Sequence, residues 1–294
     1  MRKAAMFLPV MAAMLAAACG GAGGGAGLGQ VAVDTVRPPL DFTFRPPQAP
    51  MVFSVEVSGE AEFRGTSAVS SIRYRWTAKD WREEDGAWTG EVTFSDVAAS
   101  MRRGSSIAME PVEEFERLEG FSLRYRKDAG GFEPVARPAK DAAFMAMFDQ
   151  LQLGMSPLNL PSPPAPIFPG QSWQDTIGTE DLREMAQALK DSLVTVTYSA
   201  DEEFKGRPCA KIDYGGKLRL DGAIPAKEGS SLLKGTVEVK GQSYLDRQRG
   251  FLLMDSGRIK NIIDWRQLDA EGKSQGGEFS SAQNVDYTIG YQGP

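Results

Sequence analysis

The sequence contains no histidine, and only two of its 294 residues are cysteines. Without histidine the chain cannot build a Ser-His-Asp or Cys-His catalytic centre, or the zinc and iron sites that use imidazole ligands. A pH switch in the neutral range also loses its usual residue. We therefore expect a protein that is not an enzyme and needs no cofactor or metal ion, with chemistry based on carboxylates alone left open.

Positive charge is also scarce. Lysine and arginine number 33 against 39 acidic residues, which gives a formal net charge of −6. Nucleic-acid binding requires basic stripes that neutralise phosphates, and here the arginine pairs are isolated among acids. The composition therefore predicts no nucleic-acid partner.

A long hydrophobic run is missing as well. The only extended apolar run, residues 4–18, has about 15 residues, whereas a membrane-spanning helix needs about 20. The run follows Arg2 and Lys3, ends in three alanines and is followed by Cys19 and glycines. A charged start, a short apolar run and small residues before a cleavage point are typical of a signal peptide.

Because the run ends on a cysteine, it resembles the signal of bacterial lipoproteins. That resemblance implies removal of residues 1–18 and lipidation of Cys19, including palmitate, so that the lipid anchor attaches the protein to the membrane. Gly20 and Gly21 stand where an aspartate retains some lipoproteins at the inner membrane, which favours the periplasmic face of the outer membrane in the cell envelope. An ordinary secretory signal is the alternative. Loss of Arg2 and Lys3 changes the net charge of −6 to −8 and leaves Cys209 as the only other thiol, which we expect to be buried and inert.

The segment after the anchor lacks the pattern of a folded element. Residues 20–30 are nearly all Gly and Ala, and five prolines follow before Met51. We expect residues 19–50 to be a flexible Gly/Pro tether and the folded part to begin near Met51.

From Met51 onward the dominant pattern has a period of two, in which apolar and polar residues alternate. It predicts strands with one buried and one solvated face, as in an antiparallel sheet. The expected inward residues are Phe53, Val55, Val57, Ala61, Phe63, Ile72, Tyr74, Trp76, Trp88, Val92, Phe94, Val194, Val196, Tyr198, Ala210, Ile212, Tyr214, Leu218, Leu220, Val237, Val239, Val285, Tyr287, Ile289 and Tyr291. Turns are expected at Gly130-Gly131, Gly215-Gly216 and 255–257.

Helical patterns are few. Asp141 is expected to cap a helix that carries Phe144, Met147, Phe148 and Leu151 on one face. A second helix is expected over residues 179–189 and a short third over 110–118. The predicted fold class is therefore mainly β (α+β): a curved antiparallel sheet or half-barrel, or two related sheets, with two or three packed helices.

Six prolines between residues 155 and 170 exclude a regular element there. This linker separates an N-terminal β half with a helix, residues 51–154, from a C-terminal half that consists of a helix and strands, residues 171–294. One continuous sheet and two domains are both compatible with the sequence.

The sequence also resembles a group of uncharacterised bacterial lipoproteins with a domain of unknown function. The similarity lies in the lipoprotein signal, the Pro-rich linker, the Gly-x-x-Trp element at Gly170–Trp173, the stretch 233–236 and the late turn 246–250. No activity or site residue is implied by that resemblance.

The most suggestive surface is the apolar helix that begins after Asp141. We interpret Phe144, Met147, Phe148 and Leu151 as candidate ligand-binding residues that line a lipid-sized space, because methionine adapts to irregular apolar partners. Ordinary core packing of the same residues is the alternative. The predicted function is a membrane-anchored, non-catalytic envelope lipoprotein that binds an apolar, lipid-like ligand. An assembly lipoprotein that binds an envelope protein, and a carbohydrate-binding or carbohydrate-active protein that uses Trp81 or Trp88, are the alternatives.

Overall fold

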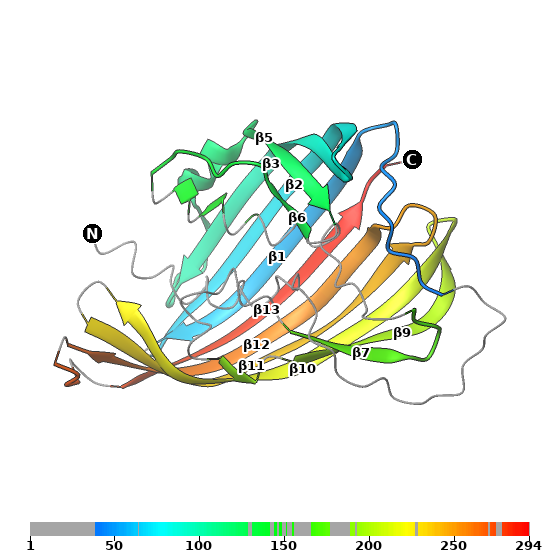
Figure 1. The fold of residues 1–294 in the computed structure, drawn as a ribbon. Coiled ribbons are helices and arrows are strands. Elements are labelled where there is room, and N and C mark those ends of the chain that lie inside the picture. Colours follow the sequence, from blue (N-terminus) through cyan, green and yellow to red (C-terminus); the bar gives the residue numbers. More distant parts are fainter. Residues whose placement is uncertain are drawn as a thin grey trace.

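The computed structural model describes residues 39–63, 65–128, 131–141, 144–145, 147–148, 151, 155, 166–176, 189–191, 193–226, 229–269, 271–274 and 278–293. In this part of the chain, thirteen strands form one sheet in which every neighbouring pair is antiparallel. The sheet is strongly curved and its two edge strands do not pair with each other, so it remains open (Figure 1). The expectation of a mainly β, curved antiparallel sheet is confirmed, in its one-sheet form.

The N-terminal half of the sheet is a set of long hairpins with a short 3-10 helix, η3. Its elements are β1 (Met51–Phe63), β2 (Thr66–Glu84), β3 (Ala87–Arg103), β4 (Glu110–Pro111), η3 (Glu113–Leu118), β5 (Ser122–Asp128) and β6 (Gly131–Pro134). β2 and β3 are joined at Asp85 and Gly86, both with positive φ, as a two-residue hairpin turn of this kind requires. Of the acidic residues 83–85, Glu83 and Glu84 therefore end β2 and Asp85 begins the turn.

The C-terminal half continues the same sheet. Its strands are β7 (Ser172–Thr176), β8 (Leu189–Asp191), β9 (Leu193–Phe204), β10 (Arg207–Ala226), β11 (Gly229–Asp246), β12 (Leu252–Leu268) and β13 (Phe279–Tyr291). The order across the sheet is β6-β5-β3-β2-β1-β13-β12-β11-β10-β9-β7, with β4 on β3 and β8 on β10. The two halves meet where the first strand pairs with the last, from Phe53 opposite Tyr291 to Phe63 opposite Ser281.

The predicted alternation holds along these strands. In β13 the inward residues Val285, Ile289 and Tyr291 are buried, whereas Asp286 and Thr288 on the other parity are exposed. One face of the sheet is thus apolar and lies on the inside of the curve, and the outer face carries charged and polar side chains.

Two of the expected turns are wrong. Gly215 and Gly216 lie inside β10, and residues 255–257 lie inside β12. The reason is close packing: a Cβ at Gly216 would lie 2.6 Å from the carbonyl oxygen of Leu193, and one at Gly257 would lie 2.7 Å from Tyr287 Oη. Glycine is needed there for close approach within the sheet and not to reverse the chain.

The expectation of two or three packed helices is also wrong. Among the described residues, α-helical structure occurs only at 144–145, 147–148 and 151, and η3 is a 3-10 helix. The third expected helix is divided between β4 and η3, where Phe115 and Leu118 share the three-residue spacing of a 3-10 turn. Of the second, residues 179–188 lie outside the described residues, and Leu189 begins β8. The extended segment 39–50, which is not a helix, contributes Leu40, Phe42 and Phe44 to the packing on the apolar strand faces.

Candidate functional site: the concave face of the sheet

Two apolar clusters lie on the inner face. The first lies mainly on the N-terminal half and extends onto β12 and β13 through Leu253, Ile289 and Tyr291, and the second lies on the C-terminal half. The N-terminal cluster is rich in aromatic residues and is centred on Phe53, Trp76 and Phe94, whose side chains are all fully buried. Phe53 stacks on Trp76 with ring centroids 4.2 Å apart. Val57 and Tyr287 contact both clusters and therefore mark the boundary between them.

The predicted ligand-binding helix covers the N-terminal cluster. Phe144, Met147, Phe148 and Leu151 are all buried, with at most 6% of any side chain exposed. Phe148 packs edge-on against Phe94, and Tyr74 Oη donates a 2.6 Å hydrogen bond to the carbonyl oxygen of Leu151.

The predicted cap of this helix is confirmed, because the backbone N–H of Phe144 donates to the Asp141 carboxylate at 2.9 Å. The structure thus brings the four predicted residues together on one face, against the sheet. Their role in binding a ligand stays a prediction, and Cys19 lies outside the described residues.

The C-terminal cluster has a different character, because most of it is aliphatic. Its floor is formed by Val194, Val196, Ile212, Leu218, Leu220, Leu233, Val237, Val239, Ile259, Ile263 and Val285. Among described apolar residues outside the sheet, only Leu40, Phe42 and Ile167 belong to this cluster, and all three lie toward one end of it. The residues of this aliphatic floor on β9–β13 are each at most 4% exposed, and no helix among the described residues packs on them.

A row of two tyrosines over two glycines crosses this floor beside the boundary. Tyr214, Gly241, Gly257 and Tyr287 occupy matching positions on the four consecutive strands β10–β13. The rings lie over the glycines, where a Cβ at either position would collide with a tyrosine hydroxyl. The two hydroxyl groups hydrogen-bond to each other. The two tyrosine rings thus cover the backbone of the two glycines, which have no side chain of their own.

A buried carboxylate holds this row in place. Tyr214 Oη donates to Asp255 at 2.7 Å, and Ser243 Oγ donates to the same carboxylate oxygen at 2.9 Å. Burial, followed by the nearby charge of Asp255, raises the pKa of Tyr214 well above its ordinary value. Tyr214 is therefore a protonated hydrogen-bond donor and not an activated nucleophile.

A second polar feature interrupts the aliphatic floor. Asn261 and Gln283 face each other across β12 and β13, and their exposed fractions are 1% and 2%. Asn261 Nδ2 donates to Gln283 Oε1 at 3.1 Å, whereas Asn261 Oδ1 and Gln283 Nε2 have no hydrogen-bond partner. Neither residue was predicted from the sequence, although both occupy the inward parity of their strands and continue the alternation.

An extended strap formed by residues 39–50 crosses one end of the curved sheet (Figure 1). The backbone of Leu40 bonds to Ile167, and Phe42 packs against Trp173 of β7 in the C-terminal half. Further along, Phe44 packs against Trp81 of β2 in the N-terminal half, with centroids 5.0 Å apart. Residues that the sequence assigned to the flexible tether thus connect the two halves of the sheet.

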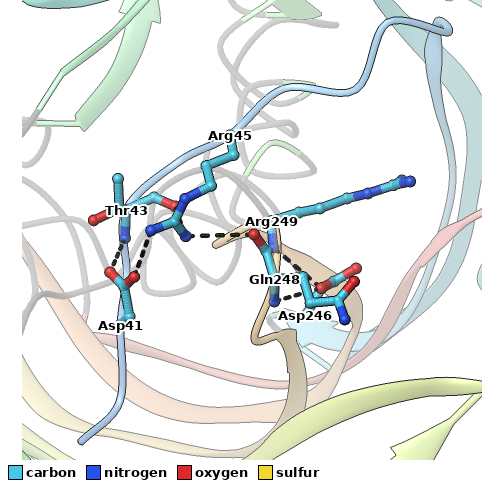
Figure 2. Close-up of polar contacts among 6 residues, drawn as sticks. All are labelled: Asp41, Thr43, Arg45, Asp246, Gln248 and Arg249. Atoms are coloured by element: carbon cyan, nitrogen blue, oxygen red, sulfur yellow. Dashed lines mark hydrogen bonds and ion pairs between the residues drawn. The ribbon is translucent and has the colours of Figure 1, made fainter. Parts of the chain in front are cut away.

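The strap is held at the turn between β11 and β12 (Figure 2). The N–H of Arg45 donates to the carbonyl oxygen of Arg249 at 2.8 Å, and its guanidinium donates to that of Gln248 at 3.3 Å. Asp246, which is 2% exposed, accepts the N–H groups of Gln248 and Arg249 at 2.8 and 3.1 Å and fixes the shape of the turn. Gly250, with φ +68°, lies directly against the Thr43 carbonyl, where a Cβ would overlap that oxygen.

Asp41 stiffens the strap itself. Its carboxylate accepts the N–H of Thr43 at 2.8 Å and pairs with the guanidinium of Arg45 at 2.6 Å. Partial burial acts to raise the pKa of Asp41, but the hydrogen bonds from Thr43 and Arg45 outweigh it and set the pKa at about 2. At neutral pH the carboxylate of Asp41 is therefore ionised, and its bonds to Thr43 and Arg45 hold this part of the strap together.

Other candidate chemistry finds little support among the described residues. They include no group of three or more His, Cys, Asp or Glu side chains arranged to hold a metal ion. Cys209 is fully buried, and its pKa is raised to about 11, by burial first and then by Asp246. All five tryptophans are described: Trp76, Trp173 and Trp265 are buried, and Trp81 and Trp88 are partly buried. No helix in the described part of the chain is long and apolar enough to cross a bilayer.

Comparison with known proteins leaves the family open. No protein-family model matches the chain, and no curated protein matches it. Solved structures with a related shape include a lipovitellin structure concerned with lipid–protein interactions, at 10% identity and a TM-score of 0.48. That match covers 86% of this chain, which spans only 26% of the lipovitellin chain.

Two bacterial structures are less similar. One is a protein described as exported, with a YmcC-like fold, from Bacteroides fragilis, at 10% identity and a TM-score of 0.23 over 84% of this chain and 98% of the other. The second is a DUF1329 family protein from Desulfovibrio piger, at 9% identity and a TM-score of 0.17 over 82% and 85% of the two chains. All three scores lie below 0.5, so these similarities assign neither a family nor a function.

Proposed function

We propose that the protein is a non-catalytic lipoprotein of the bacterial envelope that holds the acyl part of a lipid against the concave face of β9–β13. The observation that carries this proposal is the aliphatic floor of the C-terminal cluster, which lies on the inside of an open, curved sheet and is covered by no described helix. An acyl chain packed against this floor would remove its own apolar surface from water, which gains about 25 cal/mol per Å², so an acyl chain is a suitable partner.

The anchoring part of the proposal rests on Cys19 and on the strap. Lipidation of Cys19 would place a tether of residues 20–38 between the membrane and Pro39, the first described residue of the strap. Several acyl chains on one residue satisfy the requirement of more than one chain for stable anchoring. The anchor would then be attached to the end of the sheet that the strap crosses, on the periplasmic face of the outer membrane.

The test compares two adjacent isoleucines that face opposite sides of β12. Ile263 is 1% exposed and lies in the floor, whereas Ile262 is 47% exposed on the outer face. The full-length lipidated protein, held in amphipol, would be titrated with a fluorescent fatty acyl probe. We expect Ile263→Asp to abolish binding, because an inserted chain would have to desolvate a carboxylate, and Ile262→Asp to bind as the wild type does.

Circular dichroism and thermal unfolding would establish that both variants fold. Should Ile263→Asp fail to fold, Ile263→Ala removes three apolar carbons without adding charge. If all three contact the acyl chain, binding should weaken about fiftyfold, since each buried CH₂ contributes about 0.8 kcal/mol. Equal binding by the two aspartate variants, or no saturable binding by the wild type, would contradict the proposal.

A further inference from the structure

We propose that Asn261 and Gln283 form a polar recognition point within the aliphatic floor and select a neutral acyl lipid that carries both an ester carbonyl and a free hydroxyl, as in a monoacylglycerol. This inference rests on the proposed function, because it names the class of lipid that the same face would take. Its starting point is the pair of buried atoms without partners, Asn261 Oδ1 and Gln283 Nε2.

The surroundings of the pair are apolar. Val237 lies opposite Asn261 on β11, Ile259 and Ile263 lie two residues away along β12, and Val285 lies two residues beyond Gln283 on β13. A buried polar group without a partner costs about 1–3 kcal/mol, and two such groups lie side by side here. The neighbouring Ser281 shows the usual solution, since its hydroxyl accepts from Trp265 Nε1 at 3.3 Å and donates to the carbonyl oxygen of Ile263 at 3.4 Å.

The chemistry of the two atoms determines what can satisfy them. One carbonyl oxygen needs a donor and one NH₂ group needs an acceptor. Exchanging the oxygen and nitrogen of both side chains preserves the bond between them and only changes which residue carries the free donor, so the requirement does not depend on that assignment. The pair therefore needs a partner with one acceptor and one donor close together.

This requirement distinguishes among lipids. A hydrocarbon satisfies neither atom, and a methyl ester satisfies only the NH₂ group. An ionised fatty acid offers acceptors alone and would set a charge against the free carbonyl oxygen. A monoacylglycerol offers its ester carbonyl to the NH₂ group and a hydroxyl to the carbonyl oxygen. Solvent does not reach these atoms in this conformation, so a lipid held at the rim cannot meet them. A lipid reaches them only by inserting along the face and displacing the groups that shield them.

The test uses three competitors of equal chain length against the fluorescent acyl probe on the full-length protein: monooleoylglycerol, methyl oleate and 1-octadecene. We expect affinity to rise about threefold to tenfold with each added hydrogen bond, so that monooleoylglycerol binds at least about tenfold more tightly than the hydrocarbon. In Asn261→Leu/Gln283→Met, which keeps the volume of both side chains, the three competitors should bind within about twofold of one another.

Ser281→Ala is the matched control, because Ser281 is buried and polar on the same strand but already has its partners; it should keep the wild-type selectivity. A second readout is the stretching frequency of a ¹³C-labelled ester carbonyl in bound monooleoylglycerol. That frequency should be lower in the wild type than in the double variant, because a hydrogen bond weakens the C=O bond.

The outcomes separate the two proposals. Saturable binding with equal affinity for all three competitors, or selectivity that survives in the double variant, would overturn the role of Asn261 and Gln283 and leave lipid binding intact. Absence of binding for every competitor would overturn both.

Discussion

The contact between Gly250 and the strap leads to a prediction with an internal control. In Gly250→Ala, the new Cβ would lie well inside 3.0 Å of the Thr43 carbonyl oxygen, so the strap and the turn must separate by about an ångström. The left-handed conformation at φ +68° adds about 1–2 kcal/mol of strain for alanine. Separation also breaks the 2.8 Å bond from Arg45 N–H to Arg249, which contributes about 0.5–1.5 kcal/mol.

Gly206 supplies the control. It has φ +72°, close to that of Gly250, but a Cβ there would meet nothing within 4 Å. Gly206→Ala should therefore cost only the backbone strain of about 1–2 kcal/mol, whereas Gly250→Ala should cost about 1.5–3.5 kcal/mol. The difference between the two variants measures the attachment of the strap.

The assay is urea unfolding of both variants, combined with hydrogen–deuterium exchange of residues 39–50. We expect faster exchange of the strap in Gly250→Ala and unchanged exchange in Gly206→Ala. Equal losses of stability and equal exchange in the two variants would refute the view that the strap is held at this turn.

Three further predictions concern single groups. The pKa of Asp41 is about 2 in the folded protein and about 3.9 in the unfolded chain. Its hydrogen bonds therefore stabilise the strap at every pH above about 3.9 and are lost as the pH falls through 2. Tryptophan fluorescence should report an acid transition between about pH 4 and 2 that is absent in Asp41→Asn. The thiol of Cys209, with its pKa raised to about 11 from 9.0, should react with iodoacetamide at pH 8 about a hundredfold more slowly in the native protein than in urea, and rapid native labelling would contradict its burial. Asn261→Leu alone should lower the free energy of unfolding by about 1–3 kcal/mol, because it leaves Gln283 Oε1 without a partner, whereas Asn261→Leu/Gln283→Met should be at least as stable as the wild type in the same urea titration.

Much of the strand architecture could be predicted from the sequence, because alternation with a period of two is a local property of each strand. Ile72, Tyr74 and Trp76 point inward for the reason their spacing indicates. The cap at Asp141 could be predicted for a similar reason, since the capping side chain and the amide that it binds are three residues apart.

The errors arose where one residue type serves two purposes. Glycine marks turns, but at Gly257 it makes room for the ring of Tyr287, which approaches from a strand thirty positions away. The strap was missed because its partners are also remote: Arg45 meets Gln248, 203 residues further along the chain. No local pattern carries such information.

The candidate site was predicted only in part. The described residues of the predicted apolar helix, among them Phe144 and Leu151, face the sheet, but they pack against the aromatic N-terminal cluster. The aliphatic floor of the other half depends on bringing β9–β13 side by side, and the sequence did not provide this order of strands.

The most direct test of the proposed lipid binding is native mass spectrometry of the full-length protein purified from its host. A lipid attached covalently to Cys19 would survive solvent extraction, whereas a lipid held against the concave face would not. If the concave face binds a lipid, we expect about one extractable acyl lipid per chain in the wild type and in Ile262→Asp, and none in a folded Ile263→Asp. A wild-type protein that carries its anchor but never an extractable lipid would contradict the account.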